Sequence, residues 1–162
     1  MIAPTAKPVP KLHGANGRNI PWLLRAQAAA RADHPFIIWA PFDQPATRIS
    51  YAEFYSRVLS LAAGLRARGV REGDIVLLHM DNCPEFLLAW HACSQLGAVV
   101  VTTNTRSSEE ELGYFINHCK AGVAITQPAY LPLVRRSGPQ LSWVGCSDHD
   151  AGVAAKLADG AV

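Results

Sequence analysis

The chain has 162 residues, the size of one ordinary domain, and its hydrophobic content of 49% is enough to form a buried core. This composition excludes a largely disordered protein, because disorder requires low hydrophobicity and high net charge. The net charge of +2 also argues against a dedicated nucleic-acid-binding protein. Residues 1–73 carry +6 and residues 74–162 carry −4, but the basic side chains are dispersed, which predicts a solvated surface.

The first third of the chain predicts an extended arm followed by a helix and two short strands. Residues 1–20 are rich in proline and contain no apolar stretch typical of a secretory signal. A helix is expected over 21–32, because Pro21 suits a first helical turn. Short strands are expected over 36–40 and 47–49, joined by a loop or hairpin.

The clearest helix is predicted over 50–68. Ser50 and Glu53 have the spacing of a capping box, in which each side chain bonds the other residue's backbone N–H. Apolar residues then recur in steps of three and four, which gives one buried stripe. Gly69 is a natural C-terminal cap.

The remainder predicts alternating strands and helices. The run 75–80 is apolar without alternation, as in a parallel strand covered on both faces. Asn82 and Glu85 resemble a second capping box, and Ser107 or Ser108 with Glu110 or Glu111 a third. Further strands are expected over 98–103, 123–126 and 141–146, and further helices over 85–96, 107–120 and 129–136. The predicted fold is therefore α/β, with a mainly parallel sheet and helices on both faces.

Two features bear on the cellular environment. Residues 86–105 form a stretch of 20 residues without a formal charge, but polar residues interrupt it and Gly97 divides it, which favours a buried helix followed by a buried strand over a membrane span. The four cysteines form no CxxC pair, so free thiols in a reducing, cytoplasmic location are expected.

The candidate sites for chemistry are few. Neither a GxGxxG nor a GxxxxGK[ST] motif is present, and the strand-to-helix turn at 81–84 lacks the glycine that would let a phosphate approach the backbone. The glycine-containing segment 69–74 joins a helix to a strand and so lies at the wrong end of the sheet. Asp81 is interpreted as a loop or helix-entry residue. His79 is interpreted as a core or interface histidine that donates to a backbone carbonyl, with a lining role as the alternative.

Metal and acid–base sites are not indicated either. Cys146 and His149 form a CxxH pair beside Asp148 and Asp150, but a closed zinc site needs four good ligands, so a polar surface loop is the better interpretation. His79 and Cys83 are four residues apart across a strand end, where helical ligand spacing does not apply. The acids at 109–111 suit the first turn of a helix. No catalytic residue and no metal ligand is assigned, and no cofactor-binding residue is identified.

Several segments in order resemble the N-terminal part of adenylate-forming (AMP-binding) acyl-CoA synthetases over about residues 20–146. They are Ile49–Phe54, Gly69–Val76, Asp81–Phe86, Leu96–Val101, Asn104–Arg106 and Glu111–Leu112. Within that superfamily, His79–Phe86 resembles the carnitine/crotonobetaine-CoA ligase branch. One departure is Thr103, where the family commonly has a proline before the asparagine.

The resemblance implies an acid–CoA ligase that uses ATP, Mg²⁺ and coenzyme A and takes a small carboxylic acid as substrate. The family's Ser/Thr/Gly-rich phosphate loop ending in Pro-Lys-Gly is absent, as are its ribose-binding aspartate and catalytic lysine. The expectation is therefore an N-terminal fragment, with a partial domain over 21–146 and a loop with a weak helix over 147–162. This fragment would be inactive without the rest of the ligase chain. Its truncated sheet would leave unpaired edges and uncovered apolar faces, and homodimerisation through such a face is expected.

Two alternatives stay open at this level. The chain could be a stand-alone, non-catalytic module that binds a partner or dimerises. It could also be a receiver-like signalling domain with Asp81 as phospho-acceptor, although the acidic partners and the lysine of such a site are not visible.

Overall fold

The computed structural model describes residues 18–41 and 45–148, and it contains a four-stranded parallel sheet. Its strands are β3 (Ile75–His79), β4 (Val99–Thr102), β5 (Val123–Thr126) and β6 (Trp143–Cys146), in the order β4-β3-β5-β6. The predicted α/β fold with a mainly parallel sheet is confirmed. Most of the predicted N-terminal arm, the loop residues 42–44 and nearly all of the predicted final segment lie outside the described residues.

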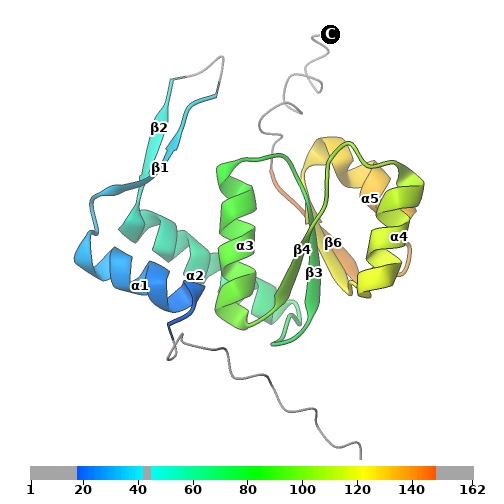
Figure 1. Ribbon diagram of the computed structural model, residues 1–162, viewed down its shortest axis with the longest axis horizontal. Coiled ribbons are helices and arrows are strands. Elements are labelled where there is room, and N and C mark those ends of the chain that lie inside the picture. The colour runs from blue at the N-terminus through cyan, green and yellow to red at the C-terminus, as the bar shows by residue number, and fades with distance from the viewer. Residues whose placement is uncertain (1–17, 42–44, 149–162) are drawn as a thin grey trace, which may run out of the picture.

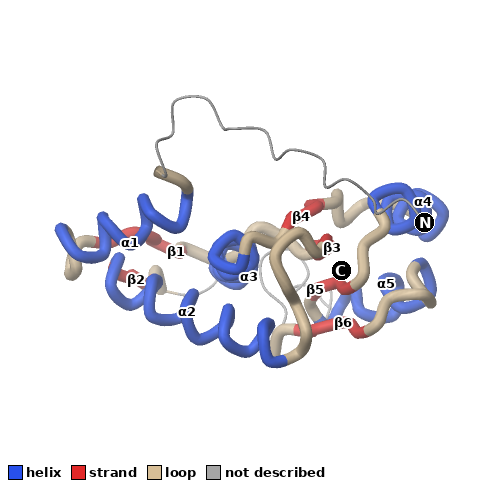
Figure 2. Tube along the Cα trace, turned by 90° about the horizontal axis from the view of Figure 1, so that it is seen from below, coloured by secondary structure: helices blue, strands red, loops and turns tan. Residues whose placement is uncertain are grey.

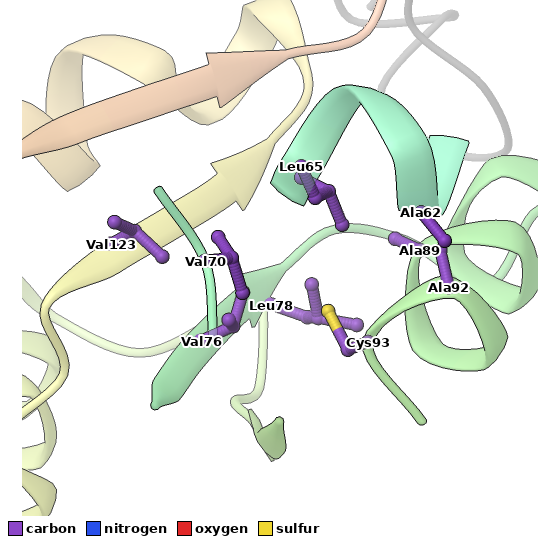
Figure 3. Close-up of a cluster of buried hydrophobic side chains, with 9 residues drawn as sticks. All are labelled: Ala62, Leu65, Val70, Val76, Leu78, Ala89, Ala92, Cys93 and Val123. Carbon is purple, nitrogen blue, oxygen red and sulfur yellow. The ribbon is translucent and has the colours of Figure 1, made fainter. Parts of the chain in front are cut away.

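Helices cover both faces of this sheet (Figure 1). On one face, α2 (Tyr51–Ala67) and α3 (Pro84–Leu96) bury a cluster that includes Leu65, Val76, Leu78 and Cys93 (Figure 3). On the other face, α4 (Glu109–Cys119) and α5 (Leu131–Ser137) pack their apolar residues on Leu77. The view along the layers shows the same arrangement (Figure 2). Neighbouring β3 residues thus alternate between two cores, which explains the unbroken apolar run.

A hairpin and a helix from the start of the described chain pack against α2 and α3. The strands β1 (Pro35–Trp39) and β2 (Thr47–Ser50) pair antiparallel, so the hairpin alternative for their connection is confirmed. With α1 (Ile20–Ala30) they form a third apolar cluster around Phe54, which is fully buried. The rings of Phe36 and Phe54 lie 4.7 Å apart between centroids, a favourable aromatic contact.

The three predicted capping boxes have different outcomes. The box at α4 is complete, since Ser108 accepts from Glu111 N–H and Glu111 bonds the Ser108 N–H in return. At α2, Ser50 accepts from Glu53 N–H at 3.2 Å, but the Glu53 carboxylate pairs with Arg57. The box at Asn82 is wrong, because α3 begins one residue later and its N-cap residue, Cys83, makes no side-chain cap bond.

The uncharged segment 86–105 is divided between α3 and β4, with Gly97 in the left-handed conformation (φ 73°) between them. Among the described residues, no helix is long and apolar enough to cross a membrane. Cys83, Cys93 and Cys119 are free thiols, as predicted, and no disulfide is present among the described residues. The helix predicted over 129–136 is confirmed as α5, which is preceded by a 3-10 turn, η1 (Pro128–Tyr130).

Candidate functional site

The candidate site lies at the carboxyl ends of β3, β4 and β5. After β3 the chain passes through α3 to β4 on one side, whereas after β5 it passes through α5 to β6 on the other side. Such a reversal between adjacent parallel strands opens the crevice in which α/β proteins usually bind their ligands. The polar residues that gather at this edge form the carboxyl-edge cluster, which consists of His79, Asp81, Thr103, Thr105, Thr126, Gln127 and Tyr130.

His79 is the innermost member of the cluster and is fully buried. Its Nδ1 lies 2.8 Å from Thr103 Oγ1, and its carbonyl oxygen accepts from Thr126 Oγ1 at 2.6 Å. The expected side-chain bond to a backbone carbonyl is therefore wrong. The reason is the parallel register of β3 and β4. It pairs Leu78 with Thr102 and so brings the next residue after each of them, His79 and Thr103, side by side.

Burial lowers the pKa of His79 below the ordinary 6.5, because an imidazolium would lose its hydration, and the nearby charge of Asp81 opposes this shift. Burial therefore favours the neutral form of the ring. Its Nε2 is buried and has no hydrogen-bond partner in the part of the chain that the structure describes.

Asp81 lies in the loop between β3 and α3, in agreement with its interpretation as a loop or helix-entry residue, and it bonds residues of two further loops. Its Oδ1 accepts from Thr105 Oγ1 at 3.1 Å and from the Tyr130 hydroxyl at 3.0 Å. Its backbone N–H donates to Gln127 Oε1 at 2.9 Å, and Gln127 is fully buried. Gln127 and Tyr130 were not predicted as site residues from the sequence, although both follow the strand 123–126 just as Asp81 follows 75–79.

The other residues singled out from the sequence do not join this cluster. Burial raises the pKa of Cys83 to about 11, so this thiol stays protonated. Cys146 is exposed at the end of β6, while His149 lies outside the described residues. Within 18–41 and 45–148, no three His, Cys, Asp or Glu side chains gather in a way that could hold a metal ion. Glu109, Glu110 and Glu111 occupy the first turn of α4, as expected.

The segment 69–74 lies at the opposite, amino-terminal edge of the sheet, as predicted. It lines a hollow of about 410 Å³ together with Lys120 and Trp143. The Arg68 guanidinium lies 5.9 Å from the centre of the Trp143 ring there. This hollow is remote from the carboxyl-edge cluster.

The described residues do not fit a nucleotide triphosphate or its magnesium ion. The turn after β3 contains no glycine, and α3 starts with Pro84, which has no N–H to offer a phosphate. At α4, the Glu111 N–H already donates to the Ser108 cap. The acids that would hold Mg²⁺ are not grouped. The carboxyl-edge cluster is a hydrogen-bonded network around one carboxylate, that of Asp81.

This architecture, a parallel sheet with a polar carboxyl edge at a point of reversal, defines an open α/β domain with helices on both faces. The profile of the AMP-binding enzyme family matches residues 24–160, and the chain belongs to that family. Crotonobetaine/carnitine–CoA ligase of Proteus mirabilis is 38% identical over 86 residues, which are 53% of this chain and 17% of that protein. Crotonobetaine/carnitine–CoA ligase of Salmonella paratyphi A is 28% identical over 119 residues, which are 74% of this chain and 23% of that protein.

Solved structures agree with this assignment. The inhibitor-bound N-terminal domain of FACL13 from Mycobacterium tuberculosis matches with a TM-score of 0.70 at 26% identity, over 80% of this chain and 33% of that one. A fatty acyl CoA synthetase from the same organism matches with a TM-score of 0.69 at 26% identity. The match covers 81% of this chain and 27% of that one. The chain thus spans about a fifth of the curated relatives described here and about a third or less of these solved chains.

Proposed function

We propose that the chain is the N-terminal part of an ATP-dependent carboxylic acid–CoA ligase. The observation that carries the proposal is the family match over residues 24–160 on a fold shared with acyl-CoA synthetases. In the complete enzyme, a substrate carboxylate attacks the α-phosphate of ATP and releases pyrophosphate. The thiol of coenzyme A then attacks the acyl-adenylate carbonyl and releases AMP. Magnesium would offset phosphate charge in the first step.

The part played by these residues is structural support. Residues 21–146 form a partial domain whose carboxyl-edge cluster is held by internal hydrogen bonds. The absence of a phosphate loop from the sequence and the poor fit of the described residues to a triphosphate support inactivity of the chain alone. The three free thiols Cys83, Cys93 and Cys119 support a cytoplasmic enzyme. Relatives named crotonobetaine/carnitine–CoA ligase make crotonobetaine and carnitine the first acids to try.

The test is carboxylate-dependent exchange of pyrophosphate into ATP. The 162-residue chain and the longest product of its gene are purified and assayed in parallel with crotonobetaine, carnitine and a panel of short and long carboxylic acids. We expect exchange with at least one acid in the long product and none in the short chain. Exchange supported by the short chain would contradict the proposed inactivity, and a long product without exchange on any acid would refute the ligase assignment.

One observation supports a second role, self-association. Strand β4 is an edge strand of the described sheet, and Val99 on it is half exposed. An open apolar edge promotes pairing with a second copy. We propose that the isolated 162-residue chain homodimerises through this edge. Sedimentation velocity should then show a mass that rises with concentration, and Val99→Arg should suppress this rise. A monomer over a wide concentration range would refute dimerisation.

A further inference from the structure

The Nε2 atom of His79 is the buried polar atom that the carboxyl-edge cluster leaves without a partner. The His79 ring is fully buried, and no described residue bonds this nitrogen. Leaving a buried polar atom unbonded is costly, so most native structures avoid it. The atom lies at the point of reversal between β3 and β5, where an α/β sheet binds its ligands.

The hydrogen bonds of Thr103 define which form of the ring is present. Thr103 Oγ1 lies 2.8 Å from His79 Nδ1 and donates to the Leu78 carbonyl at 3.3 Å. A hydroxyl has one proton, so both contacts are hydrogen bonds only if Nδ1 carries a proton and donates to Thr103. In that tautomer Nε2 is an acceptor, and its missing partner is an N–H or O–H donor.

Tyr130 is the neighbour that can make room for such a donor. Its ring meets the His79 ring edge to face, with 5.3 Å between centroids, and is itself half-buried. It lies on the three-residue turn η1, and its hydroxyl bonds Asp81 Oδ1 at 3.0 Å. A short turn of this kind shifts more easily than the strands and long helices that hold His79 from the other sides.

The direction of the chain indicates where the donor comes from. Strand β6 pairs in parallel with β5, with Cys146 opposite Thr126, so it ends at the same edge as β3. Ser147, the first residue after β6, therefore lies at this edge and donates its N–H to the Thr126 carbonyl at 3.0 Å. The aligned part is only 33% and 27% of the two Mycobacterium tuberculosis chains, so in such proteins most of the fold lies outside the matched region.

We propose that His79 accepts, at Nε2, a hydrogen bond from an N–H or O–H group in the remainder of the ligase chain. This inference rests on the proposed function. His79 is then a positioning residue, because it connects the strand ends of this part to the part of the enzyme that contains the reaction site. The Thr103 bond orients the ring, and displacement of Tyr130 admits the donor.

The direct test is nitrogen NMR of the histidine rings in two proteins, the 162-residue chain and the complete ligase. His79→Asn identifies the His79 resonances by their loss. We expect the Nδ1-protonated tautomer in both proteins. The Nε2 resonance should shift upfield in the complete ligase, as an acceptor nitrogen does when it gains a donor. An Nε2 resonance at the same position in both proteins would refute the proposal, including the case in which a water is bound in both.

Two variants of the complete ligase separate positioning from folding. Asn places a donor where Nδ1 lies and lacks the distal acceptor, whereas Gln places a carbonyl oxygen near the position of Nε2. We expect His79→Asn to lower kcat/KM for ATP–pyrophosphate exchange by about tenfold, and His79→Gln by at most about threefold. Equal losses in the two variants would contradict the role of Nε2. If the wild-type ligase exchanges with no acid, the proposed function fails while the NMR comparison still decides this inference.

Discussion

Gly97 connects α3 to β4, and replacing it with alanine should destabilise the fold measurably. The residue has φ 73°, a conformation that costs an L-residue about 1–2 kcal/mol. A Cβ at this position would lie 3.0 Å from Cγ of Glu72, a flexible side chain that can shift. The Gly97 carbonyl also accepts from the Gly73 N–H at 3.0 Å, so a distortion at Gly97 would also disturb the turn that precedes β3. We therefore expect Gly97→Ala to lower the free energy of unfolding by about 1–2 kcal/mol.

The matched control is Gly64→Ala. Gly64 is exposed within α2, and a Cβ there would meet nothing within 4 Å. Alanine is the better helix former, so this variant should be more stable by about 0.5–1 kcal/mol. Urea unfolding followed by far-UV circular dichroism measures both variants, and thermal melting should give shifts of opposite sign. If Gly97→Ala is neutral or behaves like Gly64→Ala, the left-handed conformation assigned to Gly97 is wrong.

Three further predictions concern a cap, the cysteines and pH. Ser108→Ala removes one half of the capping box of α4 and should lower the free energy of unfolding in urea by about 1 kcal/mol. The control Ser107→Ala should change it little. Equal losses in the two variants would contradict the cap. Burial raises the pKa values of Cys83 and Cys93 to about 11, whereas Cys146 is exposed. When the folded chain is treated with a thiol reagent, mass spectrometry should therefore show Cys146 modified first. Early modification of Cys93 would refute its burial. The pKa of His79 is lowered from 6.5, so the unfolded chain binds its proton more readily and the free energy of unfolding should fall as the pH drops below 6.5. That pH dependence should be weaker in His79→Asn, as measured by urea unfolding at several pH values, and an unchanged slope would show that His79 is not its source.

Local signals in the sequence were sufficient for most of the elements. The strand 123–126 and the cap at Ser108 agree with the structure because β-branched runs and Ser-x-x-Glu spacing act over a few residues. The cap expected at Asn82 fails for an equally local reason. Pro84 sets the first turn of α3, so the residue before it, Cys83, becomes the N-cap.

Most members of the carboxyl-edge cluster could not be predicted from local sequence patterns. His79 and Asp81 attract attention in the sequence, but Thr103, Gln127 and Tyr130 lie 22 to 51 residues further along the chain and carry no motif. Gln127 in particular is a polar residue that a sequence pattern would place on the surface, yet it is fully buried and bonds the Asp81 backbone. Such residues become visible only when the order of the strands is known.

The sequence by itself determined the alternation of strands and helices, the free thiols and the likeness to acyl-CoA synthetases, because each depends on neighbouring residues or on motifs in order. Tertiary structure alone decided the order β4-β3-β5-β6, and with it the point of reversal and the partner of His79. The physical reason is that the register between two parallel strands fixes which side chains meet at their ends. That register is strongly specified where a face of the sheet is buried, and here both faces are covered by residues from separate parts of the chain.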